Sequence, residues 1–100
     1  MILTVFRSRL NEDVQEEYKA LAPNILALAK TMPGFVSHKS YVAEDGERLS
    51  LVAFEDAESQ RRWALNAEHI AAQQRGREHF YSEYTVQICT VVRESRFSAE

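Results

Sequence analysis

The sequence predicts one α+β domain, residues 1–100, with the element order strand, helix, strand, strand, helix, strand. Two observations support this order. An apolar stripe at helical spacing runs from Val14 to Met32, and a hairpin signal, Asp45–Gly46, separates two strand-like segments. Unknotted, right-handed connections then favour a split sheet of strand order 4-1-3-2 with both helices on one face.

The first third of the chain supplies a strand and a long helix. Residues 2–10 are apolar on both alternating faces, which is typical of a strand covered on both sides. Asn11 to Asp13 are expected to cap the helix that follows, and Asp13 and Glu16 have the spacing of a capping box. Pro23 should kink or divide this helix, and Pro33–Gly34 should end it.

The next segment predicts a β-hairpin. Its strands cover residues 35–43 and 48–55, and in the second strand Leu49, Leu51 and Ala53 alternate with Ser50, Val52 and Phe54. The connecting turn, residues 44–47, contains Asp–Gly, which is typical of a two-residue hairpin loop.

A broken helix and a last strand complete the chain. Asp56 is expected to cap the second helix, and Asn66 a further helical piece that runs to about Arg75 and ends at Gly76. The last strand is expected over residues 84–94. Residues 95–100 should form a loose tail unless Phe97 docks.

The apolar pattern of the outer strands predicts a homodimer. The first and last strands carry apolar residues on both faces, while the helices cover only one face of the sheet. An open apolar face of several hundred Å² is unusual for a monomer. We therefore expect two sheets to pack face to face.

Composition excludes several classes of function. The net charge is −3 with scattered Lys and Arg, so neither a nucleic-acid nor a membrane partner is expected. The single Cys89, interpreted as an inert buried thiol, excludes an internal disulfide and a Cys-rich zinc site. The start of the chain has no signal-peptide pattern, and a cytoplasmic location is expected.

The candidate functional residues gather between Trp63 and Tyr84. Trp63 either lines a ligand cavity or anchors the second helix in the core. His69 is a candidate acid or base, or a ligand of iron, and is otherwise a surface or capping-region residue. His79 either faces a cavity mouth or makes a dimer or loop contact, and His38 is interpreted as structural or exposed. Because the three His lie on separate elements, no metal site is expected.

Arginine and tyrosine side chains are common in the same stretch. The second helical region is basic because it contains Arg61, Arg62, Arg75 and Arg77. These arginines either attract an anionic ligand or form a solvated face paired with Glu58, Glu68, Glu78 and Glu83. Tyr81 and Tyr84 either donate hydrogen bonds to a ligand oxygen or bridge a dimer.

An ordered set of short motifs resembles the antibiotic biosynthesis monooxygenase (ABM) family from Met1 to about Phe97. The set comprises Pro33–Gly34–Phe35, Asp45–Gly46, Phe54–Glu55, Trp63, Glu68–His69, Gln73 or Gln74, Gly76–Arg77, Tyr81 and Tyr84. The resemblance implies ferredoxin-like halves in a dimeric α+β barrel, with a cavity between helices and sheet. It also implies an oxidoreductase, since some members are cofactor-free oxygenases of aromatic polyketide quinols.

The first functional hypothesis is therefore a small cofactor-free monooxygenase acting on an electron-rich aromatic and O₂. The expected catalytic residues are His69, as acid or base, and Trp63, as pocket wall. The expected substrate-binding residues are Arg77, Tyr81, His79 and Tyr84. Such a protein supplies a dry pocket, a proton acceptor and donors for a developing oxyanion.

Two alternatives remain open. Haem-degrading members place an Asn on the first strand, a Trp on the second helix and a His further on. Here Trp63 matches, but Arg7 or Arg9 lies where the Asn is expected and Gln73 lies where the His is expected. The other alternative is a non-catalytic dimeric protein that binds a small ligand.

Overall fold

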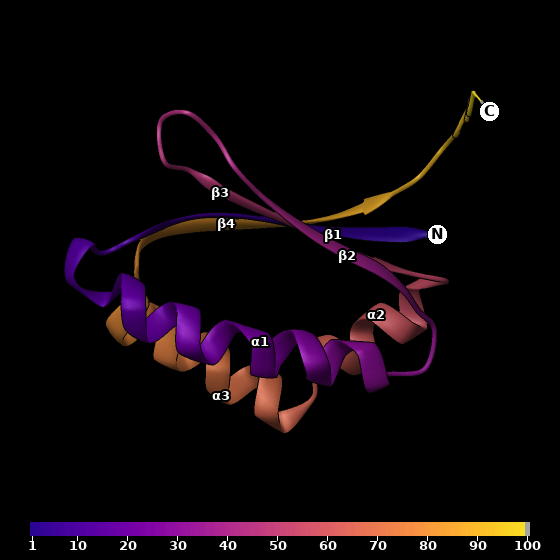
Figure 1. Cartoon of the computed structure of the whole chain (residues 1–100). Helices are drawn as coiled ribbons and strands as arrows, with labels where there is room; N and C mark the ends of the chain where they lie inside the picture. Colours follow the sequence, from indigo (N-terminus) through magenta and orange to yellow (C-terminus); the bar gives the residue numbers. More distant parts are fainter. Residues whose placement is uncertain (100) are drawn as a thin grey trace.

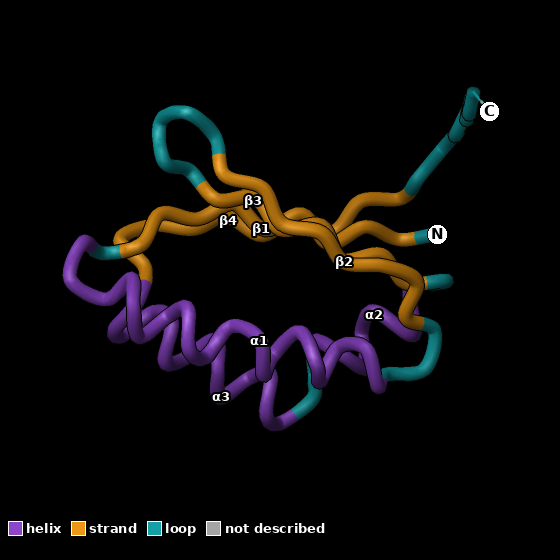
Figure 2. The backbone as a smooth tube through the Cα atoms, in the orientation of Figure 1, coloured by secondary structure: helices purple, strands orange, loops and turns teal. Residues whose placement is uncertain are grey.

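The computed structural model describes residues 1–99, apart from the side chains of Ala67 and Glu68, and forms two layers (Figures 1 and 2). One layer is an antiparallel sheet of the order β2-β3-β1-β4, formed by β1 (Ile2–Leu10), β2 (Phe35–Val42), β3 (Arg48–Phe54) and β4 (Tyr81–Thr90). The helices all lie on one face of it (Figure 1). The predicted fold class and strand order are confirmed. The expectation that Glu68 is solvated lies outside the described residues.

The helical layer consists of two antiparallel segments. A 3₁₀ turn, η1 (Glu12–Val14), leads into α1 (Gln15–Thr31). The second segment comprises α2 (Ala57–Ala64), α3 (Ala67–Arg75) and a π-helical turn, η2 (Gly76–Phe80). Among the described residues, no helix is both long and apolar enough to cross a membrane.

Alternation along β1 decides which side chains meet the helices. The Thr4 hydroxyl accepts a hydrogen bond from Gln60 Nε2 of α2 at 3.3 Å, so the even-numbered residues of β1 face the helical layer. The core on that side contains Ala29, Val52, Phe54 and Trp63, with Phe54 fully buried. Ala29 belongs to α1, Trp63 to α2, and Val52 and Phe54 to β3, so this core fixes the two helices against β3.

The opposite face of the sheet carries the odd-numbered apolar residues. Val5 lies opposite Leu51 on β3, and Leu3 lies opposite Ala53. No helix covers this face (Figure 1). A pocket of about 470 Å³ lies on it, lined by Val5, Tyr41 and Leu49 among others.

The start of α1 differs from the expectation. Neither Asn11 nor Val14 caps a helix with its side chain, so the predicted cap is wrong. Asn11 instead donates from Nδ2 to the His79 carbonyl at 3.1 Å and from its backbone N–H to the Phe80 carbonyl at 2.8 Å. The Asn11 side chain, expected to cap the helix, is thus hydrogen-bonded to η2 instead. The helix also continues through Pro23 without dividing.

The hairpin is confirmed, but its loop contains three residues and not two. Ala43 N–H donates to the Glu47 carbonyl at 2.8 Å, and Gly46 N–H donates to the Ala43 carbonyl at 3.0 Å. Gly46 has φ +89, a left-handed conformation that glycine adopts at no steric cost.

In the second helical segment, the predicted caps Asp56 and Asn66 are confirmed, but the predicted end at Gly76 is wrong. Asp56 Oδ1 accepts from Ser59 N–H at 2.8 Å, and Asn66 Oδ1 accepts from His69 N–H at 3.4 Å. Gly76 does not end the helix, because the chain continues through the π-helical turn to Phe80.

The last strand is β4, Tyr81–Thr90, so the predicted range 84–94 begins and ends too late. The strand begins as early as Tyr81 because Tyr81 pairs with Leu10, the last residue of the neighbouring strand β1. Residues 91–99 leave the sheet (Figure 1), and Phe97 is 91% exposed. Cys89 is half-buried, against the expectation of a buried thiol.

Candidate functional site

Trp63 and His69, predicted to be catalytic, lie against each other. The turn between α2 and α3 stacks their rings with centroids 4.1 Å apart and an interplanar angle of 24°. Both residues are buried, at 7% and 9% exposure. Trp63 also packs on Phe54 at 5.5 Å, so it anchors α2 to the sheet as the core interpretation predicted.

This stacked pair holds two unsatisfied polar atoms. Trp63 Nε1 and His69 Nδ1 are buried, and no described group lies within hydrogen-bond geometry of either atom. Such atoms are rare in native proteins, and each calls for an explanation. Burial lowers the pKa of His69, and the backbone carbonyls of Ala64 and Trp63, which lie near the ring but outside hydrogen-bond geometry for Nδ1, partly oppose this shift by favouring the charged form. The imidazole is therefore neutral at neutral pH and able to accept a proton.

A second group, the tyrosine cluster, lies farther along the same face of the sheet. It consists of Phe6, Tyr18, Tyr81 and Tyr84. Tyr81 is central, with ring centroids 5.3 Å from Phe6, 5.9 Å from Tyr18 and 5.7 Å from Tyr84. The cluster joins β1, α1 and β4 and places three phenol groups in one region.

Two guanidinium groups border the tyrosine cluster. Arg77 Nε donates to Tyr84 Oη at 2.5 Å, and the Arg48 guanidinium lies 5.2 Å from the Tyr18 ring centroid. Burial and the hydrogen bond to Tyr18 raise the pKa of Tyr81, whose hydroxyl donates to Tyr18 Oη at 3.5 Å. Tyr81 is therefore a proton-bearing donor and not a base.

Gly76 makes room for the central tyrosine. A Cβ at this position would lie 2.5 Å from Tyr81 Cε2 and 2.9 Å from Cδ2. Because real Cβ atoms do not approach so closely, only glycine lets the Tyr81 ring pack on the π-helical turn. The local sequence Gly76–Arg77 thus positions both Tyr81 and the guanidinium that contacts Tyr84.

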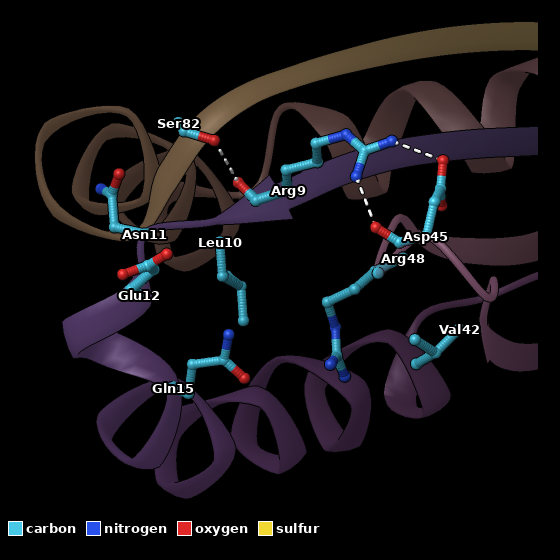
Figure 3. A pocket seen from close by; sticks show the side chains of 10 residues that line it. Arg9, Leu10, Asn11, Glu12, Gln15, Val42, Asp45, Arg48 and Ser82 are labelled. Carbon is cyan, nitrogen blue, oxygen red and sulfur yellow. Dashed lines mark hydrogen bonds and ion pairs between the residues drawn. The ribbon is translucent and has the colours of Figure 1, made fainter.

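A pocket of about 470 Å³ lies where β1 meets α1 (Figure 3). One of its lining residues, Arg48, contacts the Tyr18 ring of the tyrosine cluster. Leu10, Gln15 and Arg48 point into the space between the strands and α1. Arg9, which also lines the pocket, donates to the Asp45 carbonyl at 2.9 Å and to Asp45 Oδ2 at 2.8 Å. The volume is within the range of small-ligand sites.

The predicted site residues thus form two groups. Trp63 packs on Phe54, which pairs with Ile2, whereas Tyr81 and Tyr84 contact Phe6. Positions 2 and 6 of an extended strand lie roughly 13 Å apart. None of the predicted site residues lines either of the two pockets described above.

The other histidines lie apart from both groups. His79 Nε2 lies 2.7 Å from Glu17 Oε2, and Arg75 donates to the other oxygen of the same carboxylate at 2.8 Å. This is an exposed ion-pair network, as the surface interpretation of Arg75 predicted, but its carboxylate is that of Glu17 and not one of the glutamates named for it. His38 Nε2 lies 3.2 Å from Ser40 Oγ on β2.

Sequence reasoning missed Arg48 and Tyr18. The sequence pattern places Tyr18 in the apolar stripe of residues 14–32 and Arg48 at the beginning of the strand expected over residues 48–55. Arg48 nevertheless has the same parity in β3 as Val52 and Phe54, which are buried against the helices. A charged residue on the inward face of a strand is the signal that would have identified it.

The described side chains do not fit an axial ligand for haem. His69 stacks on Trp63 within the core, His79 is held by Glu17, and His38 is hydrogen-bonded to Ser40. No group of three or more His, Cys, Asp or Glu suited to a metal ion occurs among the described residues.

Residues 1–75 match the family described as Antibiotic biosynthesis monooxygenase. An uncharacterised protein, YqjZ of Bacillus subtilis strain 168, is 27% identical over 93 residues, which cover 93% of this chain and 82% of YqjZ. Among solved structures, SnoaB, a cofactor-independent oxygenase from Streptomyces nogalater, superposes with a TM-score of 0.79 at 16% identity, over 93% of this chain and 94% of SnoaB. Rv0793 from Mycobacterium tuberculosis superposes with a TM-score of 0.83 at 14% identity, over 95% of this chain and 98% of Rv0793.

These structural similarities establish the shared fold, and the sequence match establishes the descent. Because that match spans residues 1–75 of a 100-residue chain, the chain belongs to the antibiotic biosynthesis monooxygenase family.

Proposed function

We propose that this protein is a cofactor-free monooxygenase that oxidises an electron-rich aromatic at an activated CH₂ or quinol carbon. For an activated methylene the reaction is R₂CH₂ + O₂ → R₂C=O + H₂O. One oxygen atom forms the carbonyl group and the other leaves as water. The substrate itself supplies all four electrons, so no external reductant is needed. SnoaB, which shares this fold, is a cofactor-independent oxygenase.

The unsatisfied Trp63–His69 pair carries the proposal. The substrate must lose a proton before it can donate an electron to O₂, and a neutral imidazole accepts a proton near pH 7. Burial lowers the pKa of His69 and keeps its ring neutral. Its Nδ1 atom makes no hydrogen bond to a described group, so we assign the role of general base to the His69 imidazole and that of ring-stacking wall to Trp63.

The tyrosine cluster would stabilise the oxygen that becomes negative. Tyr84 Oη accepts from Arg77 and keeps its own O–H for a developing oxyanion, and the Tyr81 O–H, which donates to Tyr18 at 3.5 Å, would turn to the same oxygen when a substrate binds. Phe6 is the member of the tyrosine cluster on β1, and the other end of that strand, at Ile2, pairs with Phe54, on which Trp63 packs. An elongated aromatic along the helix-facing side of β1 would contact both groups. His79 belongs to the proposed site only as a group at its rim.

Oxygen uptake tests the activity. Purified protein is mixed under air with anthrone and with simple hydroquinones, and the product is analysed after a reaction in ¹⁸O₂. Catalysed uptake with one ¹⁸O atom in the carbonyl product is expected. No acceleration across the panel would overturn the proposal and favour the non-catalytic ligand-binding alternative.

Variants then test the assigned roles. His69→Gln should lower turnover by about 100-fold, within the range for a lost general base. His79→Gln serves as the histidine control, because that ring contacts Glu17 on the surface, and only a small effect on KM is expected. Full turnover in His69→Gln would remove the base from the mechanism.

We also propose that the working form is a homodimer. The support is the uncovered sheet face, where Leu3, Val5, Leu49 and Leu51 all remain only half-buried. Multi-angle light scattering should give twice the mass of the 11.5 kDa chain. Leu51→Glu should shift the mass to the monomer, since a carboxylate in an apolar interface is costly. The exposed Leu65→Glu on the helical side is the control.

A further inference from the structure

We propose that Arg48 recognises an anionic group of the ligand, specifically a carboxylate, in the pocket where β1 meets α1. This inference rests on the proposed function, because it defines the class of substrate that the same site selects. An aromatic carboxylic acid would bind in preference to its neutral analogue.

The first support is the state of Arg48. Its side chain is half-buried on the inward face of β3, and no carboxylate among the described residues forms an ion pair with it. By contrast, Arg7 pairs with Glu47 and Arg75 pairs with Glu17. The one described partner of the Arg48 guanidinium is the face of Tyr18, 5.2 Å away. A half-buried guanidinium with five N–H donors and no acceptor is suited to a ligand.

The second support is the charge balance of the pocket. The two acidic groups on its wall are Asp45 and Glu12. Asp45 is already neutralised by Arg9, which also contacts Glu83 at 3.2 Å. Glu12 is exposed at the beginning of η1 and faces water. The inner part of the pocket therefore keeps one uncompensated positive charge, that of Arg48.

The third support is the shape of the pocket around that charge. Figure 3 shows Gln15 of α1 and Leu10 of β1 pointing toward the space that Arg48 enters. The Gln15 amide offers a further N–H donor, and Leu10 offers an apolar surface for a ring. A planar carboxylate accepts two parallel hydrogen bonds from one guanidinium, which Lys does not reproduce.

The pocket also leads toward the tyrosine cluster. Leu10 pairs with Tyr81 across β1 and β4, and Arg48 stacks on Tyr18, which receives the Tyr81 hydrogen bond. A ligand whose carboxylate binds Arg48 would thus extend its ring system toward the phenols. The acid group would set the register of the aromatic body in the site.

Calorimetric titration with two matched probes tests the inference. The probes are 9-anthracenecarboxylate and its neutral analogue 9-anthracenemethanol. Wild-type protein should bind the carboxylate at least 10-fold more tightly than the alcohol. Arg48→Gln should weaken carboxylate binding by about 10- to 100-fold, as expected for a hydrogen-bonded charge, and leave alcohol binding unchanged.

Further variants separate charge from geometry and from folding. Arg48→Lys keeps the charge and the stem, and carboxylate binding should fall between wild type and Arg48→Gln. Glu12→Gln should strengthen carboxylate binding by a few-fold, because it removes the repulsive charge at the rim. Arg7→Gln, which breaks an ion pair with Glu47, is the control and should change neither affinity.

The outcomes distinguish this inference from the proposed function. Equal affinities for the two probes, no detectable binding of either at millimolar concentration, or an unchanged preference in Arg48→Gln would overturn the role of Arg48, whatever the oxygen-uptake result. A carboxylate preference that depends on Arg48 in a protein that turns over no substrate would support the anion site and overturn the oxygenase.

Discussion

Replacing Gly76 with Ala tests the packing that positions the tyrosine cluster. The new Cβ would lie 2.5 Å from Tyr81 Cε2, whereas ordinary contacts begin near 3.4 Å, so the ring must move by about 1 Å. Overpacking of this kind costs about 1–3 kcal/mol. The better helix propensity of Ala offsets about 0.5–1 kcal/mol. We therefore expect the free energy of unfolding to fall by about 0–2.5 kcal/mol, with loss of the Tyr81–Tyr18 hydrogen bond.

A double-mutant cycle isolates the clash from other effects. Tyr81→Val removes the ring and keeps a residue suited to the start of β4. In that background Gly76→Ala should stabilise the protein by about 0.5–1 kcal/mol, because only the propensity gain remains. The coupling energy from urea denaturation should then be about 1–3 kcal/mol. Additive effects within 0.5 kcal/mol would refute the claim that Gly76 is required by the Tyr81 ring.

Three further predictions concern stability. Asp56→Ala should lower the free energy of unfolding by about 1 kcal/mol, because the helix cap is lost. Glu58→Ala, which removes an exposed ion pair with Arg62, should lower it by no more than about 0.5 kcal/mol. Equal losses in urea denaturation would contradict the capping role of Asp56. Gly34→Ala should cost more than Gly46→Ala, because both have positive φ but only Gly34 lies against Ser59, with its Cβ 2.2 Å from Oγ; a thermal melt that ranks them the other way would refute this. Burial lowers the pKa of His69, so neutral His69 contributes its full stabilisation above the ordinary pKa of 6.5, and this stabilisation is lost as pH falls through 6.5 toward the pKa of the folded state. Fluorescence of the single Trp63 should report this loss of stability. If His69→Phe shows the same acid sensitivity, His69 is not the source.

Local patterns in the sequence determined the layout of the fold. The apolar period of residues 14–32, the Asp45–Gly46 turn and the Asp56 cap each depend on neighbours within one or two turns of chain. Chain chirality then restricted the strand order, which the structure confirms. Residue types and the family resemblance also single out the candidate residues between Trp63 and Tyr84, whose functional roles stay predictions.

Only the tertiary structure decided how those residues are grouped. The stacking of His69 on Trp63 depends on the angle between α2 and α3, which no periodicity records. Asn11 does not cap the helix because its side chain donates to the His79 carbonyl of η2. Arg48 and Tyr18 meet because β3 and α1 pack face to face. These contacts join residues distant in sequence, and such contacts depend on packing geometry, which local sequence patterns do not determine.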